Sequence, residues 1–311
     1  MTLTLLTGLP RSGTTLLCAL LSGLPDTVAL AEPMPGQKAD DPAEVIANVT
    51  AFAAGVRERA LGLGVVPSKA IAGRVIDNFM EAPKEGSGLR RVLSRTQDVA
   101  VGKPLTEGFR LYIKHPALFT ALAQHLPDTL PLYAMVRSPL AVLASWQTID
   151  FPVHYGHIPA AEKLDPELHR TLAAIPDRID RQVAVMDWFL RQFIRLPPGR
   201  VIRYEDLTAN PAATLSALQP VTGRVKHDIY RQRAEDRYSM VDMAELARRL
   251  ARIAPLAERF YPRFRHTLKE TWEGAPSVLR SPGLDGKGQK RRIDFFIAGV
   301  QKGGTTALAL S

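Results

Sequence analysis

The feature that most constrains this chain is a strand, a glycine-containing loop and a helix that follow one another directly near its start. "TLTLL" is a short run of apolar, β-prone residues that leads straight into "GLPRSGTT", residues 8–15. The chain continues with "TLLCALLSGL", which is apolar on every side and is typical of a helix buried against a sheet and ended near Gly23 and Pro25. A buried strand that passes through such a loop into a buried helix indicates an α/β fold whose loop turns backbone N–H groups toward an anion.

The loop departs from the nucleotide-phosphate pattern G-x-x-x-x-G-K-[ST] in one informative way. Gly8 and Gly13 have the required spacing and Thr15 takes the Ser/Thr position, but Thr14 stands where the lysine belongs. Without that lysine, one strong reason to expect chemistry at the γ-phosphate of ATP is lost. Arg11 lies inside the loop instead and offers a fork of donors with a permanent positive charge. A tail of two phosphates, or of a phosphate and a sulfate, would fit this loop.

Short apolar strands alternate with helical segments along most of the chain. This alternation predicts a three-layer α/β fold with a central parallel sheet, of the P-loop nucleotide-binding type. One long helix is expected to begin with Asp41 as its N-cap and Pro42 at its first position. The expected strands are 2–6, 27–32, 109–114, 130–136 and 200–204, and the expected helices after the first are 41–61, 116–126, 139–147, 177–195, 211–218 and 241–264.

Composition and charge narrow the class of protein. The 311 residues are 46% apolar and 23% charged, as in ordinary globular proteins, and no apolar run reaches the ~18 residues of a membrane span. The first residues lack the basic region and cleavage site of a secretory signal, so we expect a cytoplasmic protein. Cys18 is the only cysteine and no metal-ligand spacing is found, so we expect no disulfide and no metal. The net charge of +9 favours an anionic ligand, but the basic residues are too spread out to favour nucleic acid.

The composition changes after residue 272. Residues 273–292 are rich in Gly, Pro, Ser and charged residues, which is typical of a linker. Residues 293–311 then repeat the opening of the chain, because the glycines, the basic residue and the paired threonines of "GVQKGGTT" match those of "GLPRSGTT". We therefore expect one domain over 1–272, a linker, and the truncated start of a second copy of that domain, so that the full-length protein could be a tandem.

A second motif, "MVRSPLAVLASW", follows the expected strand at 130–136. Arg137 ends this strand, at the mouth of the sheet where open α/β folds bind ligands. Ser138 is expected to cap the next helix, and Ser145 follows two helical turns later on the same face. An arginine with a nearby hydroxyl is typical of a phosphate site. Magnesium-dependent NTPases often carry an aspartate at such a strand end, so arginine here favours a donor that is handled without a metal.

Together these motifs resemble the sulfotransferases that use 3′-phosphoadenosine 5′-phosphosulfate (PAPS). "GLPRSGTT" is similar to their 5′-phosphosulfate loop, "VRSPLAVLAS" to their 3′-phosphate motif, and "VIRYEDLTANPAATLSAL" to a segment that follows a late strand. The resemblance covers residues 2–265, and the arginine in the loop is like bacterial members and tyrosylprotein sulfotransferases. It implies donor binding by Pro10, Arg11, Ser12, Gly13, Thr14, Thr15, Arg137, Ser145 and Tyr204.

The resemblance also implies a reaction, in which a sulfuryl group moves in line from PAPS to an acceptor hydroxyl or amine. Arg11, Lys114 and the loop amides would stabilise its charge without a metal. Glu32, at the end of the second strand, stands near the place of the general base in tyrosylprotein sulfotransferases. His115 replaces the aspartate of their Lys-Asp-Pro motif, and it is either a structural residue or the alternative base.

Several readings of function stay open at this point. The loop would also suit a P-loop small-molecule kinase, which needs Mg²⁺ and a carboxylate to hold it, or a nucleotide-binding domain without turnover. The acceptor could be a glycan, a lipid, a peptide tyrosine or a small metabolite. Its pocket is expected to be built from the helical segments within 37–110 and within 150–195. The aromatic and histidine residues of "DFPVHYGHIP" (150–159) could line it, but for this segment we favour mixed packing roles in a loop.

Overall fold

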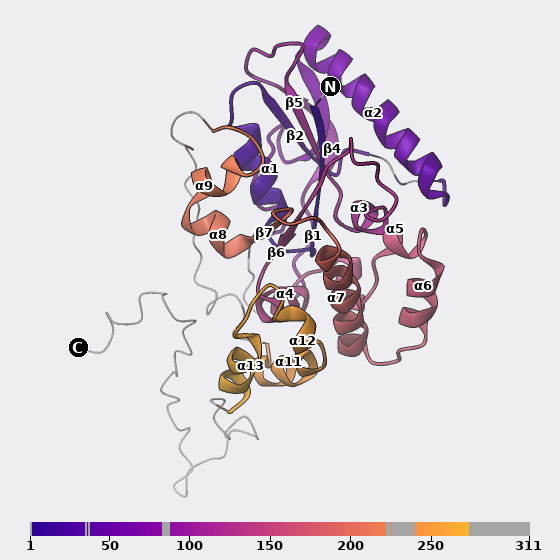
Figure 1. Cartoon of the computed structure of the whole chain (residues 1–311), viewed down its shortest axis with the longest axis vertical. Coiled ribbons are helices and arrows are strands. Elements are labelled where there is room, and N and C mark those ends of the chain that lie inside the picture. Colours follow the sequence, from indigo (N-terminus) through magenta and orange to yellow (C-terminus); the bar gives the residue numbers. More distant parts are fainter. Residues whose placement is uncertain are drawn as a thin grey trace, which may run out of the picture.

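A five-stranded parallel sheet forms the centre of the molecule, as the alternation of strands and helices predicts (Figure 1). The computed structural model describes residues 2–34, 36, 38–82, 88–221, 225, 238 and 241–273. The strands lie in the order β2-β5-β1-β6-β7, and every neighbouring pair is parallel. Their bounds are β1 Thr2–Gly8, β2 Thr27–Ala31, β5 Arg110–Lys114, β6 Leu132–Val136 and β7 Val201–Arg203. Because all five run in one direction, their carboxyl ends meet at one edge of the sheet.

Helices cover both faces of this sheet and complete the predicted three layers (Figure 1). Successive residues of β1 point to opposite faces, so Leu5 and Leu6 belong to different apolar clusters. On one face lie α1 (Thr14–Ser22), α8 (Tyr204–Ala209) and α9 (Pro211–Ser216). On the other face lie α2 (Pro42–Leu63), α3 (Pro116–Ala121), α4 (Pro139–Trp146) and α7 (Arg178–Ile194).

Helix α2 has the start that its sequence predicts. The Asp41 side chain accepts a hydrogen bond of 2.9 Å from the Glu44 amide, and Pro42 occupies the first turn. Gly64 ends the helix in a left-handed conformation with a φ of 65°. Within the described part of the chain, no helix combines the length and the apolar character needed to cross a bilayer.

Shorter helices build the rest of the molecule beside α4 and α7. They are η1 (Pro152–Tyr155), α5 (Pro159–Glu162), α6 (Pro166–Ala173), α11 (Met243–Leu250), η2 (Ala251–Ile253), α12 (Ala254–Ala257) and α13 (Phe264–Glu273). The single helical segment expected at 241–264 is therefore divided into three short helices, and α13 begins where it was expected to end. Leu250 and Leu268 pack in the same cluster as Val183 of α7, so these last helices share the core of the sheet domain.

An antiparallel pair of strands, β3 (Val65–Ala70) and β4 (Arg95–Ala100), was not predicted. Pro67 lies within β3, and proline is unfavourable inside a strand. β4 is polar and mostly exposed, so neither segment carries a strong strand pattern. The Ser68 hydroxyl accepts a hydrogen bond of 3.0 Å from the Ala31 amide at the end of β2. The pair therefore extends the structure beside β2, next to the carboxyl edge of the main sheet.

The two expectations for the end of the chain are not tested. Glu273, the first residue of the expected linker, is the last residue of α13. The rest of that linker and the repeated motif at 293–311 lie outside the described residues. The domain over 1–272, the linker and the second copy stay predictions.

Candidate active site

Hydrogen bonds hold the loop between β1 and α1 against strand β6 and helix α4. The Leu9 amide and the Ser12 hydroxyl both donate to the Met135 carbonyl of β6, at 3.2 and 3.0 Å. The Trp146 indole N–H of α4 donates to the Pro10 carbonyl at 2.8 Å. Ser12, predicted to bind the donor, is fully buried, so its hydroxyl fixes the loop.

Gly13 and Arg11 give the loop its shape. Gly13 has a φ of 96°, and a Cβ there would lie 2.4 Å from Cδ2 of Tyr204, so only glycine fits against this ring. Arg11 has a φ of 73°, and Glu32, directly after β2, has a φ of 45°. Such left-handed conformations are uncommon outside glycine and gather at functional sites. The loop then opens into α1, whose first N–H groups have no partner within the helix and are available to bind an anion.

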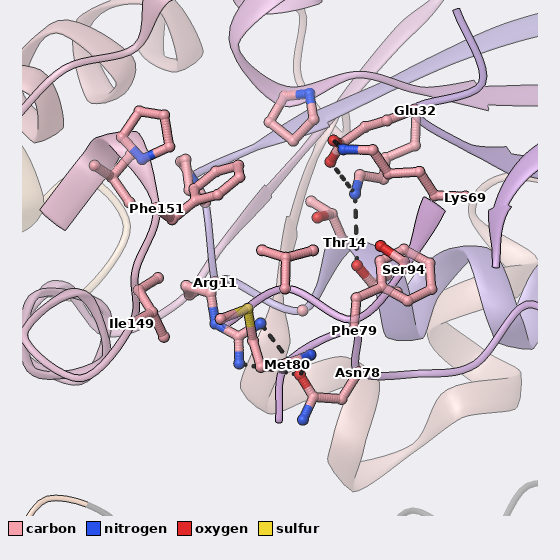
Figure 2. A pocket seen from close by; sticks show the side chains of 18 of the residues that line it. Arg11, Thr14, Glu32, Lys69, Asn78, Phe79, Met80, Ser94, Ile149 and Phe151 are labelled. Atoms are coloured by element: carbon pink, nitrogen blue, oxygen red, sulfur yellow. Dashed lines mark hydrogen bonds and ion pairs between the residues drawn. The ribbon is translucent and has the colours of Figure 1, made fainter. Parts of the chain in front are cut away.

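The Arg11 side chain lies between two segments that are distant in sequence. Its Nε lies 3.4 Å from the Ser145 hydroxyl, and both terminal nitrogens lie 3.2 Å from Oδ1 of Asn78 (Figure 2). Ser145 was expected to pair with Arg137, but its buried hydroxyl faces Arg11 instead. The serine therefore supports the arginine inside the loop.

Arg137 comes directly after β6 and reaches the loop from the other side. Its guanidinium lies over the Tyr204 ring, 4.6 Å from the ring centre, and Nη1 is 3.5 Å from the Arg11 carbonyl oxygen. The two residues that the sequence assigns to donor binding at these strand ends are thus in contact. The prediction that the Ser138 side chain caps α4 was wrong. Ser138 stands at the N-cap position without a side-chain hydrogen bond to the helix, and its amide donates to Oε1 of Glu205 at 3.1 Å.

Glu32 and two lysines form the second part of the site. Oε1 of Glu32 lies 2.6 Å from Nζ of Lys114, which also approaches the Thr15 hydroxyl at 3.5 Å. The second carboxylate oxygen pairs with Lys69 of β3 (Figure 2). Lys114 is almost fully buried and ends β5, which lies between β1 and β2 in the sheet. The strand order therefore brings Thr15, Lys114 and Glu32 into one chain of polar contacts.

Two groups of this part have shifted pKa values. Burial of Glu32 acts to raise its pKa, but the charges of Lys114 and then Lys69 outweigh burial and hold the pKa well below its usual range. Burial lowers the pKa of His115 to about 4, with the two lysines adding to the effect and Glu32 opposing it. At neutral pH the site therefore holds a charged carboxylate beside an uncharged imidazole.

One cavity of about 540 Å³ joins these groups, a size typical of a small-molecule site. Most of the residues predicted from the sequence line it, namely Pro10, Arg11, Gly13, Thr14, Thr15, Glu32, Lys114, His115, Arg137 and Tyr204. Ser12 and Ser145 are buried behind the wall and act on the loop and on Arg11. The structure thus brings the predicted residues to one place, with ten facing the cavity and two supporting it.

Sequence analysis missed several residues of this cavity. Lys69 depends on the unpredicted strand β3, and Asn78 lies in an irregular segment that no motif marks. The segment 150–159, for which we favoured packing roles, does line the cavity through Phe151, His157 and its neighbours. Its run of aromatic and proline residues next to a predicted site was the signal that could have identified it.

Comparisons with known proteins identify a family. A family model described as "Sulfotransferase family" matches residues 4–225. Among solved structures, a sulfotransferase domain from the curacin biosynthetic pathway is 15% identical and covers 75% of this chain and 78% of its own, with a TM-score of 0.36. The sulfotransferase STF1 from Mycobacterium tuberculosis is 12% identical and covers 80% of this chain and 76% of its own, with a TM-score of 0.34.

Both TM-scores are below 0.5, and a comparison with curated protein sequences finds no significant match. The family model alone covers well over half of the chain. It also spans both polar motifs of the cavity, from the loop at Gly8 to the segment after Tyr204. The chain belongs to the sulfotransferase family.

Proposed function

We propose that this protein transfers a sulfuryl group from PAPS to an acceptor hydroxyl or amine, in line and without a metal ion. The observation that carries the proposal is the cationic end of the cavity. There Arg11, Lys114 and Arg137 converge on the first turn of α1 from three neighbouring strand ends. Fixed positive charges around an anion-binding helix start suit a donor that carries phosphate and sulfate groups.

The donor would bind with its phosphosulfate on the loop and its 3′-phosphate at Arg137. The amides of Gly13, Thr14 and Thr15 lie at the start of α1, where they can donate to phosphate oxygens. Arg137 offers a planar guanidinium already held over the Tyr204 ring. A cradle of this kind fits a nucleotide with two separated anionic groups.

In the transfer, the bond between sulfur and the bridging phosphate oxygen breaks and a bond between sulfur and the acceptor oxygen forms. Arg11 and Lys114 would stabilise negative charge on the sulfuryl oxygens and on the departing phosphate. The leaving group would be adenosine 3′,5′-bisphosphate. The proton of the acceptor hydroxyl would pass to a base in the same cavity, so that the product is a sulfate ester.

We assign that base to Glu32, with His115 as the alternative. Glu32 is charged at neutral pH and touches Lys114, so its carboxylate is held beside the reacting group. The low pKa of Glu32 makes it a weak base, and the same is true of His115 at about 4. Contact with Lys114 favours Glu32 as the base. The proton would pass from the acceptor hydroxyl to the carboxylate that Lys114 holds, and Lys114 would also stabilise the negative charge on the departing phosphate.

A binding experiment tests the donor without knowledge of the acceptor. Melting temperatures would be measured with adenosine 3′,5′-bisphosphate or with ATP, each with Mg²⁺ and with EDTA. At a concentration of ~100 Kd, the bisphosphate is expected to raise the melting temperature by about 5–10 °C with or without EDTA. If ATP with Mg²⁺ raises the melting temperature and adenosine 3′,5′-bisphosphate does not, the result would support a kinase and contradict the proposal.

A further inference from the structure

The cavity has an apolar end that the donor groups do not use. Phe79, Met80, Ile149 and Phe151 all line the cavity. Figure 2 shows Met80, Ile149 and Phe151 on the side of the cavity where Arg11 lies and Phe79 beside Ser94, whereas Glu32 and Lys69 form the polar corner. Val92, Pro116, Ala117, Val153, Ile158 and Ala160 extend the apolar lining. We call Phe79, Met80, Ile149 and Phe151 the apolar wall.

Main-chain hydrogen bonds hold the apolar wall in place. The Leu93 amide donates to the Phe79 carbonyl at 2.8 Å, which pairs the part of the wall that holds Phe79 and Met80 with the segment around residue 92. Arg90 in turn exchanges main-chain bonds with the segment that carries Ile149, through Thr148 at 3.1 Å and Asp150 at 2.9 Å. Both halves of the wall are therefore joined in one ladder, so the apolar surface is formed before a ligand binds.

Charged side chains near the wall already have partners within the protein. Arg90 is only 3% exposed, and it donates to the Thr148 hydroxyl at 2.7 Å. Glu81 pairs with Arg91 at 3.3 Å, and Lys69 pairs with Glu32. An anionic acceptor such as a sulfated glycan would have to compete for these cations, and a sugar would leave its hydroxyl groups against apolar side chains.

We propose that the acceptor is an uncharged alcohol or phenol whose apolar body lies against the apolar wall. Its hydroxyl group would reach the corner formed by Glu32 and Lys114. This inference rests on the proposed function, because it identifies the acceptor of the same reaction. The hydroxyl loses its proton to Glu32 as its oxygen bonds to sulfur, and the product is an organic sulfate monoester.

An acceptor comparison tests this directly. Radiolabelled PAPS would be incubated with the enzyme and 2-naphthol or 1-octanol, and separately with N-acetylglucosamine, desulfated heparin or an acidic tyrosine peptide. We expect kcat/KM for an apolar alcohol to exceed that for each polar acceptor by at least about tenfold, the effect of burying an apolar group of this size. A preference for the sugar, the heparin or the peptide would overturn the inference.

A pair of phenylalanine substitutions locates the effect on the wall. Phe151 and Phe52 are both half-buried, but Phe52 lies on α2 and does not line the cavity. Phe151→Ser should raise KM for 2-naphthol about tenfold and leave the affinity for adenosine 3′,5′-bisphosphate unchanged. Phe52→Ser should change neither value. If Phe151→Ser leaves KM for 2-naphthol at the wild-type value, the apolar wall does not hold the acceptor.

Equilibrium binding gives a readout that needs no turnover and no variant. Fluorescence of 2-naphthol would be titrated with wild-type protein that is saturated with adenosine 3′,5′-bisphosphate. Binding that 1-octanol displaces, and N-acetylglucosamine does not, supports the inference. If the bisphosphate binds but 2-naphthol does not, the inference is wrong while the proposed donor stands. If the bisphosphate itself fails to bind, the proposed function is wrong.

Discussion

The two ends of the cavity are built from different parts of the fold. At the polar end, Glu32 and Lys114 stand at the ends of neighbouring strands of one parallel sheet. Arg11 follows the next strand of that sheet and lies beside Met80 and Ile149 of the apolar wall, and each of the three side chains is held by charge or hydrogen bonds. At the apolar end, Phe79 and Phe151 come from irregular connections that are joined only by short main-chain ladders. The sheet fixes the charges that a donor needs, whereas the connections form the surface that an acceptor meets. Changes at one end should therefore affect one substrate more than the other.

The largest effect is expected at Glu32, at the polar end of the cavity. Glu32→Gln keeps the size of the side chain but removes its ability to take a proton, and general-base catalysis contributes about 10²–10⁴-fold. We expect kcat to fall by that factor while adenosine 3′,5′-bisphosphate still raises the melting temperature. His115→Asn serves as the comparison and should lose clearly less. Near wild-type turnover for Glu32→Gln, with an inactive His115→Asn, would move the base to the imidazole.

Arg137→Ala should affect the donor end alone. Loss of a charge-assisted contact to phosphate amounts to about 1.5–3 kcal/mol, so donor affinity should fall at least about tenfold, with KM for the acceptor unchanged. Arg200 offers a matched control, because its guanidinium lies 4.4 Å from the centre of the Tyr133 ring but does not line the cavity. Calorimetry on Arg137→Ala and Arg200→Ala measures the difference. Equal losses in the two variants would remove Arg137 from the donor site.

Acid should disturb the polar end through His115. The folded-state pKa of His115 is about 4 against an ordinary value of 6.5, so the unfolded chain binds more protons between these values. The contribution of His115 to stability is therefore complete above pH 6.5 and is lost as the pH falls toward 4, by about 1–3 kcal/mol. Urea unfolding at pH 7 and 4.5 should show a smaller loss for His115→Asn than for wild type. A Phe151→Ser variant that flattens the pH dependence equally would contradict this assignment.

The smallest effect is expected at Lys69, whose side chain is 27% exposed and shares Glu32 with Lys114. Lys69 helps to lower the pKa of Glu32, so Lys69→Met should raise that pKa toward its ordinary value. The acid limb of the pH–rate profile should move upward, with kcat at neutral pH changed by less than about tenfold. Lys269→Met on the exposed face of α13 is a suitable control. An unchanged acid limb would show that Lys69 does not act on Glu32.

Sequence alone could predict the polar end because its residues stand next to local signals. Gly8 ends the apolar strand β1, Arg137 comes directly after β6, and parallel strands bring their carboxyl ends to one edge. The strand order was not predictable, and it is this order that places Lys114 between Thr15 and Glu32.

The apolar end could not be predicted in the same way. Phe79 and Ile149 carry no periodic pattern, and they reach the same cavity through pairings across long stretches of chain, such as the bridge between Arg90 and Ile149. Lys69 was missed for a related reason, because β3 contains a proline and is paired with a polar strand. The long-range pairing that forms these surfaces is the part of the fold that local sequence signals do not determine.

The most direct test of the account follows the sulfuryl group itself. Wild-type protein would be incubated with radiolabelled PAPS and 2-naphthol in the presence of EDTA, and both products would be separated and counted. Sulfuryl transfer from PAPS predicts labelled 2-naphthyl sulfate and one adenosine 3′,5′-bisphosphate for each label transferred. Failure to transfer label, together with phosphorylation of the same alcohol by ATP and Mg²⁺, would contradict it.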